Sequence, residues 1–256
     1  MNNEAFINHL STIPSLDSIP PAIASRNLQL EVAEPALAAV TGQALIGFVA
    51  GMSQQAREDV LDTVTYATLA ADKRHNVMTE NGDWYKTFRG AMTRALNWTP
   101  QDVAYVSRSS RERVLSLDQV GLQLVASSIA AAATGGPAGA LILQVAQEAV
   151  EGLRKQSEPA RLFNSRSQTP GGARFLIGGC NESADGVIAL AIGAVDVKTS
   201  VNVTNVLFAN WNSVSVDLHQ SADILVFHQS LYAHRRERVR QAIQQSSDAA
   251  FMEFPI

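Results

Sequence analysis

The sequence is poor in cysteine and in charge, and each shortage excludes something. A single cysteine, Cys180, rules out an internal disulfide, and its position beside two glycines is typical of a packed small hydrophobe rather than of a nucleophile. Charged residues make up only 17% of the 256 residues, and the net charge is −4. Nucleic-acid binders usually present a strongly basic surface, so we expect no nucleic-acid partner.

The motifs that announce common chemistries are also missing. There is no glycine-rich nucleotide loop, no G-x-S-x-G nucleophile turn and no H-E-x-x-H zinc motif. The histidines, including His219 and His228, do not stand at ligand spacing with Cys, Asp or Glu. We therefore expect no catalytic residues, no cofactor and no metal, and an enzyme with an unrecognised site is only a third hypothesis.

The N-terminus lacks both a basic segment and a continuous apolar segment, so we expect no secretory signal peptide. Residues 1–24 contain prolines and no sustained periodicity, which indicates an extended arm. The alternating stretch "NLQLEV" at 27–32 then predicts a strand, and residues 25–250 are expected to form one domain.

Helical periodicity dominates up to about residue 155. A helix is expected to start near Pro35, because Leu37, Val40, Ala44 and Phe48 stand at helical spacing. Further helices are predicted over about 55–73, with Ser53 as its N-cap, 83–97, 117–133 and 138–155. The apolar stripes of the last two are expected at Leu117, Val120, Leu124 and Ala131, and at Leu141, Val145, Ala149 and Leu153.

The most apolar stretch, "IAAAATGGPAGALIL" from Ile129 to Leu143, joins those two helices. It lacks the lysine and the preceding strand of a phosphate loop. No formally charged residue occurs between Asp118 and Glu148, but glutamines and the Gly-Gly-Pro break divide this longer run into arms of roughly 15 residues, shorter than the about 20 predominantly apolar residues that span a membrane. It is best interpreted as the apex of a helical hairpin, with Pro137 opening the second helix.

Residues 160–233 are richer in β-branched and alternating sequence. Strands are predicted at "ARLFNSRS", "ARFLIGGC", "GVIALAIGAVDVKT", "VNVTNVLFANW", "SVSVDLHQ" and "ADILVFHQSLY", with a hairpin turn at Asp185–Gly186. A basic helix over about 234–246 follows, before a loose tail. Its arginines at 235, 236, 238 and 240 form either a solvated face or a contact for lipid headgroups or an acidic partner.

This order of elements resembles the Cyt-type δ-endotoxins, the small cytolytic crystal toxins of insect-pathogenic bacteria. The resemblance is carried by "RNLQLEVAEP", "WTPQDVAYVSRS", Leu117 to Arg154, "ARLFNSRS" and "VNVTNVLFANWNSVSVDLHQSADILVFHQSLY". It implies an α+β fold: a single-domain, three-layer α-β-α sandwich whose central antiparallel sheet is wrapped by helical hairpins. The helical layers would come from about 36–155 and the main strands from about 160–233.

The same resemblance implies a membrane-active toxin that binds phospholipid bilayers directly. Such proteins are made soluble in the producing bacterium, dimerise in solution, lose their ends to proteases and act outside the cell. They then form homo-oligomeric pores, or disorder the lipid as a detergent does. The alternative is a non-lytic soluble protein, with a binding or structural role, that retains the fold.

Strand length together with the resemblance locates the expected membrane-engaging strands, because a spanning strand needs roughly 9 to 11 residues. Their candidate residues are Val187, Ile188, Leu190, Ile192, Val195, Val201, Val203, Val206, Phe208, Trp211, Val214, Val216 and Leu218. The same residues would also serve as sheet core. Two features depart from the family. The helical hairpin is rich in alanine and glycine, and the arginine-rich C-terminal helix is a feature that the family resemblance does not imply.

Overall fold

The computed structural model describes residues 36–75, 81–101, 108–110, 116–132, 137–198, 206–208, 217–246 and 251–255. The expected arm at 1–24 and the strand at 27–32 lie outside these residues. The helices are α2 (Gln54–Arg74), α3 (Asn81–Arg94), α4 (Leu117–Ala131), α5 (Pro137–Lys155), α6 (Ser157–Ser167), α7 (Gln229–Tyr232) and α8 (Arg236–Gln244). The strands are β1 (Leu37–Thr41), β2 (Ala44–Phe48), β3 (Trp98–Pro100), β4 (Arg108–Ser110), β5 (Gln168–Thr169), β6 (Gly172–Glu182), β7 (Ile188–Lys198), β8 (Asp217–Phe227) and β9 (Phe251–Pro255).

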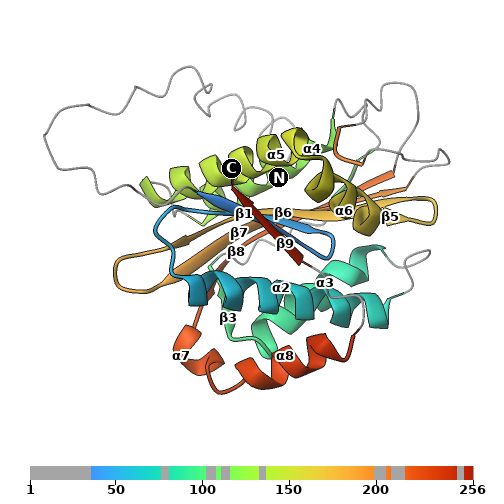
Figure 1. The fold of residues 1–256 in the computed structure, drawn as a ribbon. Helices are drawn as coiled ribbons and strands as arrows, with labels where there is room; N and C mark the ends of the chain where they lie inside the picture. The colour runs from blue at the N-terminus through green and yellow to red at the C-terminus, as the bar shows by residue number, and fades with distance from the viewer. Residues whose placement is uncertain are drawn as a thin grey trace, which may run out of the picture. The chain divides into compact units, whose positions relative to one another are not determined.

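One sheet runs through the described part of the chain in the order β3-β8-β7-β6-β2-β1-β9, with β4 beside β8 and β5 beside β6. Its centre is the antiparallel trio β6, β7 and β8, each 11 residues long. Helices cover both faces, so the expected α+β sandwich with three layers is confirmed (Figure 1). The sheet is not purely antiparallel, because β2 pairs with β6 in parallel.

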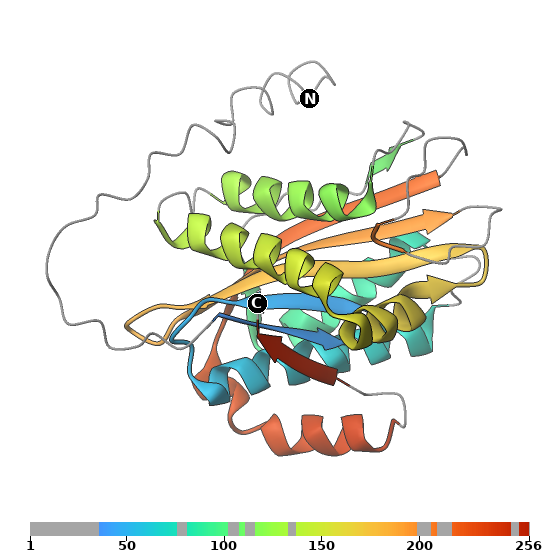
Figure 2. The same ribbon diagram turned by 45° about the horizontal axis from the view of Figure 1, so that its top comes forward.

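The two faces of the sheet carry separate cores. Alternate residues of β7 point to opposite faces: Leu190 and Ile192 join the core under α2 and α3, whereas Ala191 and Val195 join the core under α4, α5 and α6. Figure 2 shows α4 and α5 side by side on one face of the sheet, with α2 and α3 on the other. Both faces of β6 and β7 are therefore withdrawn from water.

The helix expected after Pro35 is wrong, because Leu37 to Phe48 form the hairpin of β1 and β2. Gly42 has a φ of 54° at the first position of a two-residue turn, where glycine is favoured. The apolar run is nearly continuous and buried on both faces, so it satisfies helical spacing as readily as strand spacing. Periodicity alone could not separate the two.

The strand expected at "ARLFNSRS" is also wrong, because these residues belong to helix α6. The buried residues of α6 are Pro159, Phe163 and Ser167, spaced four apart as one helix face requires. Pro159 lies in the first turn, where its missing N–H costs the helix nothing. The continuous run of strands therefore begins only after α6, at Gln168.

Several predicted elements are confirmed with adjusted faces. Ser53 caps α2 by accepting a hydrogen bond from the backbone N–H of Ala56 at 3.2 Å. Pro137 opens α5 as expected, but Leu141 is exposed, so the buried stripe of α5 runs through Ile142 instead. The stripe of α4 is likewise turned, with Ala131 exposed and Gly121, Val125, Ser128 and Ile129 buried.

The end of the chain corrects a further expectation. Residues 251–255, expected as a loose tail, form β9 and pair antiparallel with β1 at the edge of the sheet. The basic helix is confirmed as α8. Strand β8 ends at Phe227, and the last part of "ADILVFHQSLY" is the short helix α7.

Replacement of Phe88 by alanine tests the core under α2 and α3. Phe88 is fully buried and stacks on Trp84 and Tyr85 with centroid separations of 5.6 and 5.7 Å. We expect Phe88→Ala to lower the free energy of unfolding in urea by about 3–5 kcal/mol. Lys86→Ala, an exposed change on the same helix, should leave the unfolding curve in place. Equal effects of the two would contradict this packing.

Candidate functional site

The region singled out by the sequence consists of the long strands β6, β7 and β8 and the α4–α5 hairpin above them. Ile188, Leu190, Ile192 and Val195 are fully buried in β7, and Leu218 is buried in β8. Val187 lies outside the strand, in the loop between β6 and β7, and is 43% exposed. In this structure the described candidate residues of β7 and β8 are part of the sheet core, which was the structural role expected for them beside membrane contact.

The remaining candidate residues are not brought together. Val206 and Phe208 were expected in a strand but lie in a turn, where Val206 is buried and its N–H donates to the Asn164 side chain of α6 at 3.0 Å. The strand prediction is wrong at these two positions; at Val206 a side-chain acceptor from the distant helix α6 takes the backbone donor that a ladder would need. Val201, Val203, Trp211, Val214 and Val216 lie outside the described residues.

Helices α4 and α5 approach the sheet through glycines. A Cβ added to Gly179 of β6 would stand 2.0 Å from the backbone oxygen of Ile142 in α5, and one added to Gly47 of β2 would stand 2.1 Å from that of Val145. A Cβ on Gly193 of β7 would stand 2.6 Å from the Cβ of Leu124 in α4. The helix backbone thus rests directly on the sheet, a contact that only glycine allows.

Polar side chains join α4 to α5, and the backbone N–H of Asp118 in α4 donates to the backbone oxygen of Leu207 at 3.3 Å. Arg154 of α5 pairs with Asp118 of α4 at 2.9 Å, where the two helices meet at the end opposite their apex. Gln144 donates to Glu148 one turn further along α5 at 2.7 Å. The Arg154 guanidinium also lies 4.7 Å from the centre of the Phe208 ring, which ties the 206–208 turn to the same end.

The opposite layer is attached to the sheet by buried charge. Asp223 of β8 is 3% exposed and accepts hydrogen bonds from the Tyr85 hydroxyl at 3.0 Å and from Arg89 Nε at 2.9 Å, both on α3. Arg174 of β6 pairs with Asp196 of β7 at 2.6 Å and lies over the ring of Trp84. Breaking such pairs in a dry interior is costly, so this layer is held by directional bonds as well as by packing.

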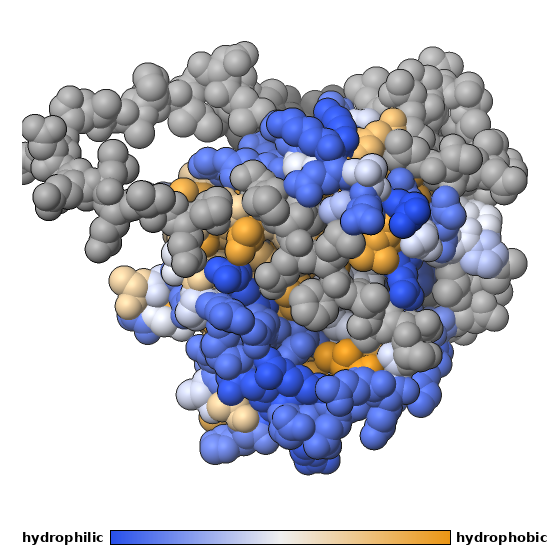
Figure 3. Space-filling model, viewed as in Figure 1, coloured by the Kyte–Doolittle hydropathy of each residue, from blue (hydrophilic) through white to orange (hydrophobic). Residues whose placement is uncertain are grey.

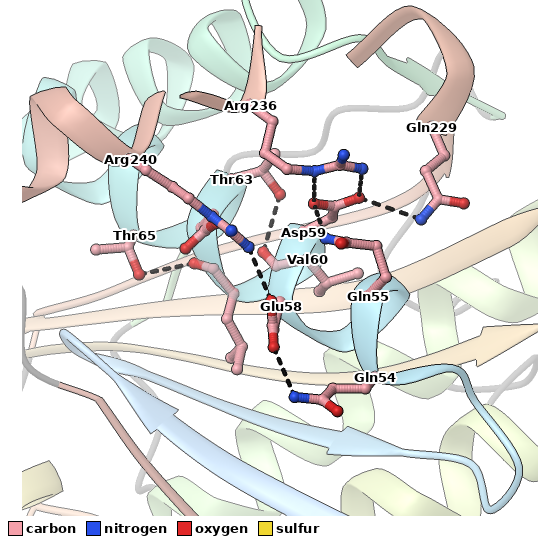
Figure 4. A network of polar contacts seen from close by, with 12 residues as sticks. Gln54, Gln55, Glu58, Asp59, Val60, Thr63, Thr65, Gln229, Arg236 and Arg240 are labelled. Atoms are coloured by element: carbon pink, nitrogen blue, oxygen red, sulfur yellow. Dashed lines mark hydrogen bonds and ion pairs between the residues drawn. The ribbon is translucent and has the colours of Figure 1, made fainter. Parts of the chain in front are cut away.

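A second polar network joins α8 to the outside of α2 (Figure 4). Asp59 is fully buried, and its carboxylate accepts hydrogen bonds from Nε and Nη2 of Arg236 at 2.6 and 2.7 Å. Arg240 bridges Glu58 and Asp62 at 2.8 and 2.7 Å. Burial raises the pKa of Asp62, while the hydrogen bond from Arg240 opposes that rise.

This network corrects the interpretation of the arginine cluster. Arg236 and Arg240 are used inside the protein, and Arg235 donates to the backbone oxygen of Ala95 at 2.6 Å. Arg238 is exposed. Sequence reasoning treated the four as one surface. The signal that could have separated them is the helical spacing of Glu58 and Asp62, which presents two carboxylates on one face of α2.

The described residues hold neither a cluster of His, Cys, Asp and Glu able to bind a metal ion nor a helix long and apolar enough to cross a membrane. Cys180 is fully buried, and burial raises the pKa of its thiol far above the usual range. It therefore lacks the exposed thiolate of a reactive cysteine.

Comparison with solved structures shows a remote likeness. No family model and no curated protein matches the sequence. A solved structure described as a delta-endotoxin aligns with 81% of this chain and 89% of its own length, at 12% identity and a TM-score of 0.42. A likeness this remote does not carry over an activity.

The glycine contacts predict opposite effects for two identical substitutions. Gly179→Ala places a methyl group against the backbone of α5 and should lower the free energy of unfolding by about 1–3 kcal/mol. Gly90→Ala, in a helix with only the Arg94 side chain near its new Cβ, should raise it by roughly 0.5–1 kcal/mol. Urea denaturation measures both. A stable Gly179→Ala protein would show that α5 does not rest on β6.

The α2–α8 network predicts that two neighbouring arginines differ. Arg236→Ala leaves the buried Asp59 carboxylate without its cation and with only the amides of Gln55 and Gln229 as donors, and we expect a loss of about 2–4 kcal/mol in thermal or urea unfolding. Arg238→Ala removes an exposed charge from the same helix and should change nothing measurable. If the two variants unfold alike, the ion pair contributes no stability.

Proposed function

We propose that the protein binds phospholipid bilayers and permeabilises them, by assembling into an oligomeric pore or by disordering the lipid as a detergent does. One observation carries the proposal: the two helical layers are attached to the sheet by different forces. The α2–α3 layer is attached through Asp223, Arg89 and Tyr85, whereas α4 and α5 rest on the sheet through apolar and glycine contacts. A bilayer can replace the second kind of contact but not the first.

The physical reasoning concerns which contacts depend on water. Apolar contacts hold two surfaces together because water is excluded from between them, and hydrocarbon excludes water equally well. No formally charged residue occurs between Asp118 and Glu148, so most of α4 and the first half of α5 can lie against lipid without burying charge. Displacement of this hairpin would uncover one face of β6, β7 and β8.

The uncovered strands are long enough to span a bilayer, but a single copy cannot insert them. Each of the three has 11 residues, and a tilted spanning strand needs about 9–11. An open sheet edge cannot lie in hydrocarbon with its N–H and C=O groups unpaired. Insertion therefore requires several copies to pair edge to edge, which is why we propose homo-oligomers on the membrane. Shallow disordering of the lipid requires no such pairing.

We also propose where the protein acts. It binds the phospholipid of a target cell, outside the cell that produces it. Dimerisation in solution and removal of the chain ends by proteases are carried by the sequence resemblance alone. The strongest competitor is a non-lytic protein of the same fold, in which α4 and α5 never leave the sheet.

A disulfide between α4 and β6 tests whether the hairpin must move. A Cβ on Gly121 would stand 3.4 Å from the Cβ of Ile177, close to the about 3.5–4.5 Å of natural disulfides. In Gly121→Cys/Ile177→Cys the Ile177 atoms nearest to the new Cβ are removed. We expect the oxidised protein to release no dye from phosphatidylcholine vesicles, and reduction to restore release.

The comparison is internal, because the oxidised and reduced forms are the same molecule. Cys180 is buried and belongs to the core on the opposite face, so it does not compete for the new thiols. Full leakage by the oxidised form would refute the moving hairpin. Absence of leakage by the unmodified protein, before and after protease trimming and with several lipids, would refute permeabilisation and favour the non-lytic alternative.

A further inference from the structure

Three large apolar side chains are exposed among the described residues. Leu141 is 41% exposed, Val187 43% and Leu231 57%. They come from α5, from the β6–β7 loop and from α7, segments that are far apart in the sequence. Single exposed apolar residues are ordinary on protein surfaces, so their position relative to one another decides whether they matter.

All three lie at the same end of the sheet. The β6–β7 ladder closes with Glu182 opposite Ile188, and Val187 follows in the loop beyond it. Ile188 also pairs with Phe227, the last residue of β8, so that α7 begins at this end too. Helix α5 starts above the same end, and Figures 1 and 2 both show its first turn, the β6–β7 loop and α7 on the left.

The exposed residues near Leu141 and Leu231 differ in character. Next to Leu141, the exposed residues of the two helix ends are small and apolar: Ala130, Ala131, Pro137, Ala138 and Ala140. In the segment that follows Leu231 along the chain, His234, Arg235, Glu237 and Arg238 are exposed. In contrast, the face formed by α2 and α8 is mostly hydrophilic (Figure 3).

The β6–β7 loop also carries one carboxylate. Asp185 accepts a hydrogen bond from the Ser183 hydroxyl, which lowers the pKa of Asp185 and keeps it ionised. This charge opposes deep burial of the loop in lipid. The loop is therefore suited to the headgroup region rather than to the hydrocarbon.

We propose that this apolar end, defined by Leu141, Val187 and Leu231, is the surface that first docks on the bilayer. The proposal deepens the function proposed above and rests on it. The three side chains belong to all three layers of the fold, so a partner that contacts them together must be broad and flat, as a bilayer surface is. Two exposed arginines, Arg235 and Arg238, follow Leu231 along the chain and outnumber the one exposed carboxylate between them, Glu237, so this segment adds attraction for anionic headgroups.

Charge substitutions at the apolar end provide the first test. Leu141→Asp, Val187→Asp and Leu231→Asp change exposed positions, so the fold should be retained, which circular dichroism checks. We expect each to weaken partition onto vesicles of phosphatidylcholine with phosphatidylglycerol by about tenfold or more, measured by flotation. The matched control is Pro170→Asp, which places the same charge in the exposed turn at the other end of β6.

An environment-sensitive dye provides a second test that does not disturb binding. Single cysteines at positions 141, 187, 231 and, as control, 170 can be labelled selectively because the native Cys180 is fully buried. On addition of vesicles, dyes at the first three positions should shift to shorter emission wavelengths, while the dye at position 170 should not. This readout holds even if one aspartate variant proves unstable.

The outcomes separate this inference from the general function. If the unmodified protein binds vesicles and the three aspartate variants bind equally well, docking through the apolar end is refuted while permeabilisation stands. If the unmodified protein binds no vesicles, both fail. If ultracentrifugation shows a dimer that Leu231→Asp dissociates, and no dye shifts on vesicles, the surface joins two copies and the bilayer proposal is overturned.

Discussion

Strands β6 and β7 carry apolar side chains on both faces, and neither face can be left against water. Ile177 and Val195 point to one side, and Leu176 and Ile192 to the other. Burial of such surface is the dominant favourable contribution to folding, so a helical layer is required on each side. The hairpin above the sheet, the α2–α3 pair below it and the packing of α8 all follow from this requirement.

The two helical layers bury the faces of the sheet through different kinds of contact. Below the sheet, aromatic rings and buried ion pairs fix α3 to β8 through directional contacts at Asp223. Above it, glycines let the backbones of α4 and α5 lie against the strands, and close packing replaces hydrogen bonds. Under the proposed function, the layer held by apolar packing is the one that lipid would displace, because hydrocarbon excludes water from apolar surfaces as the sheet does.

Long, strongly patterned segments were predictable from the sequence, and ambiguous ones were not. Helix α2, the β6–β7 hairpin and the start of α5 at Pro137 have clear periodicity, caps or turn residues. The run Leu37–Phe48 does not, because a strand buried on both faces has no polar side to reveal its period. The candidate strands were found as sheet core, but the turn at 206–208 and the exposed end of the fold depend on contacts between distant segments, which one sequence cannot display.

The pairing of the first described hairpin bears on how the chain folds. β1 and β2 are neighbours in sequence, yet β2 takes its other partner from β6, at Ala44 opposite Leu176, and β1 takes its own from β9, at Leu37 opposite Pro255. Closing loops of that length is entropically costly and slow. Until both distant strands arrive, the hairpin has two open edges that can pair with another chain. Folding therefore competes kinetically with association: the hairpin edges pair either with β6 and β9 of the same molecule or with the edge strands of another molecule.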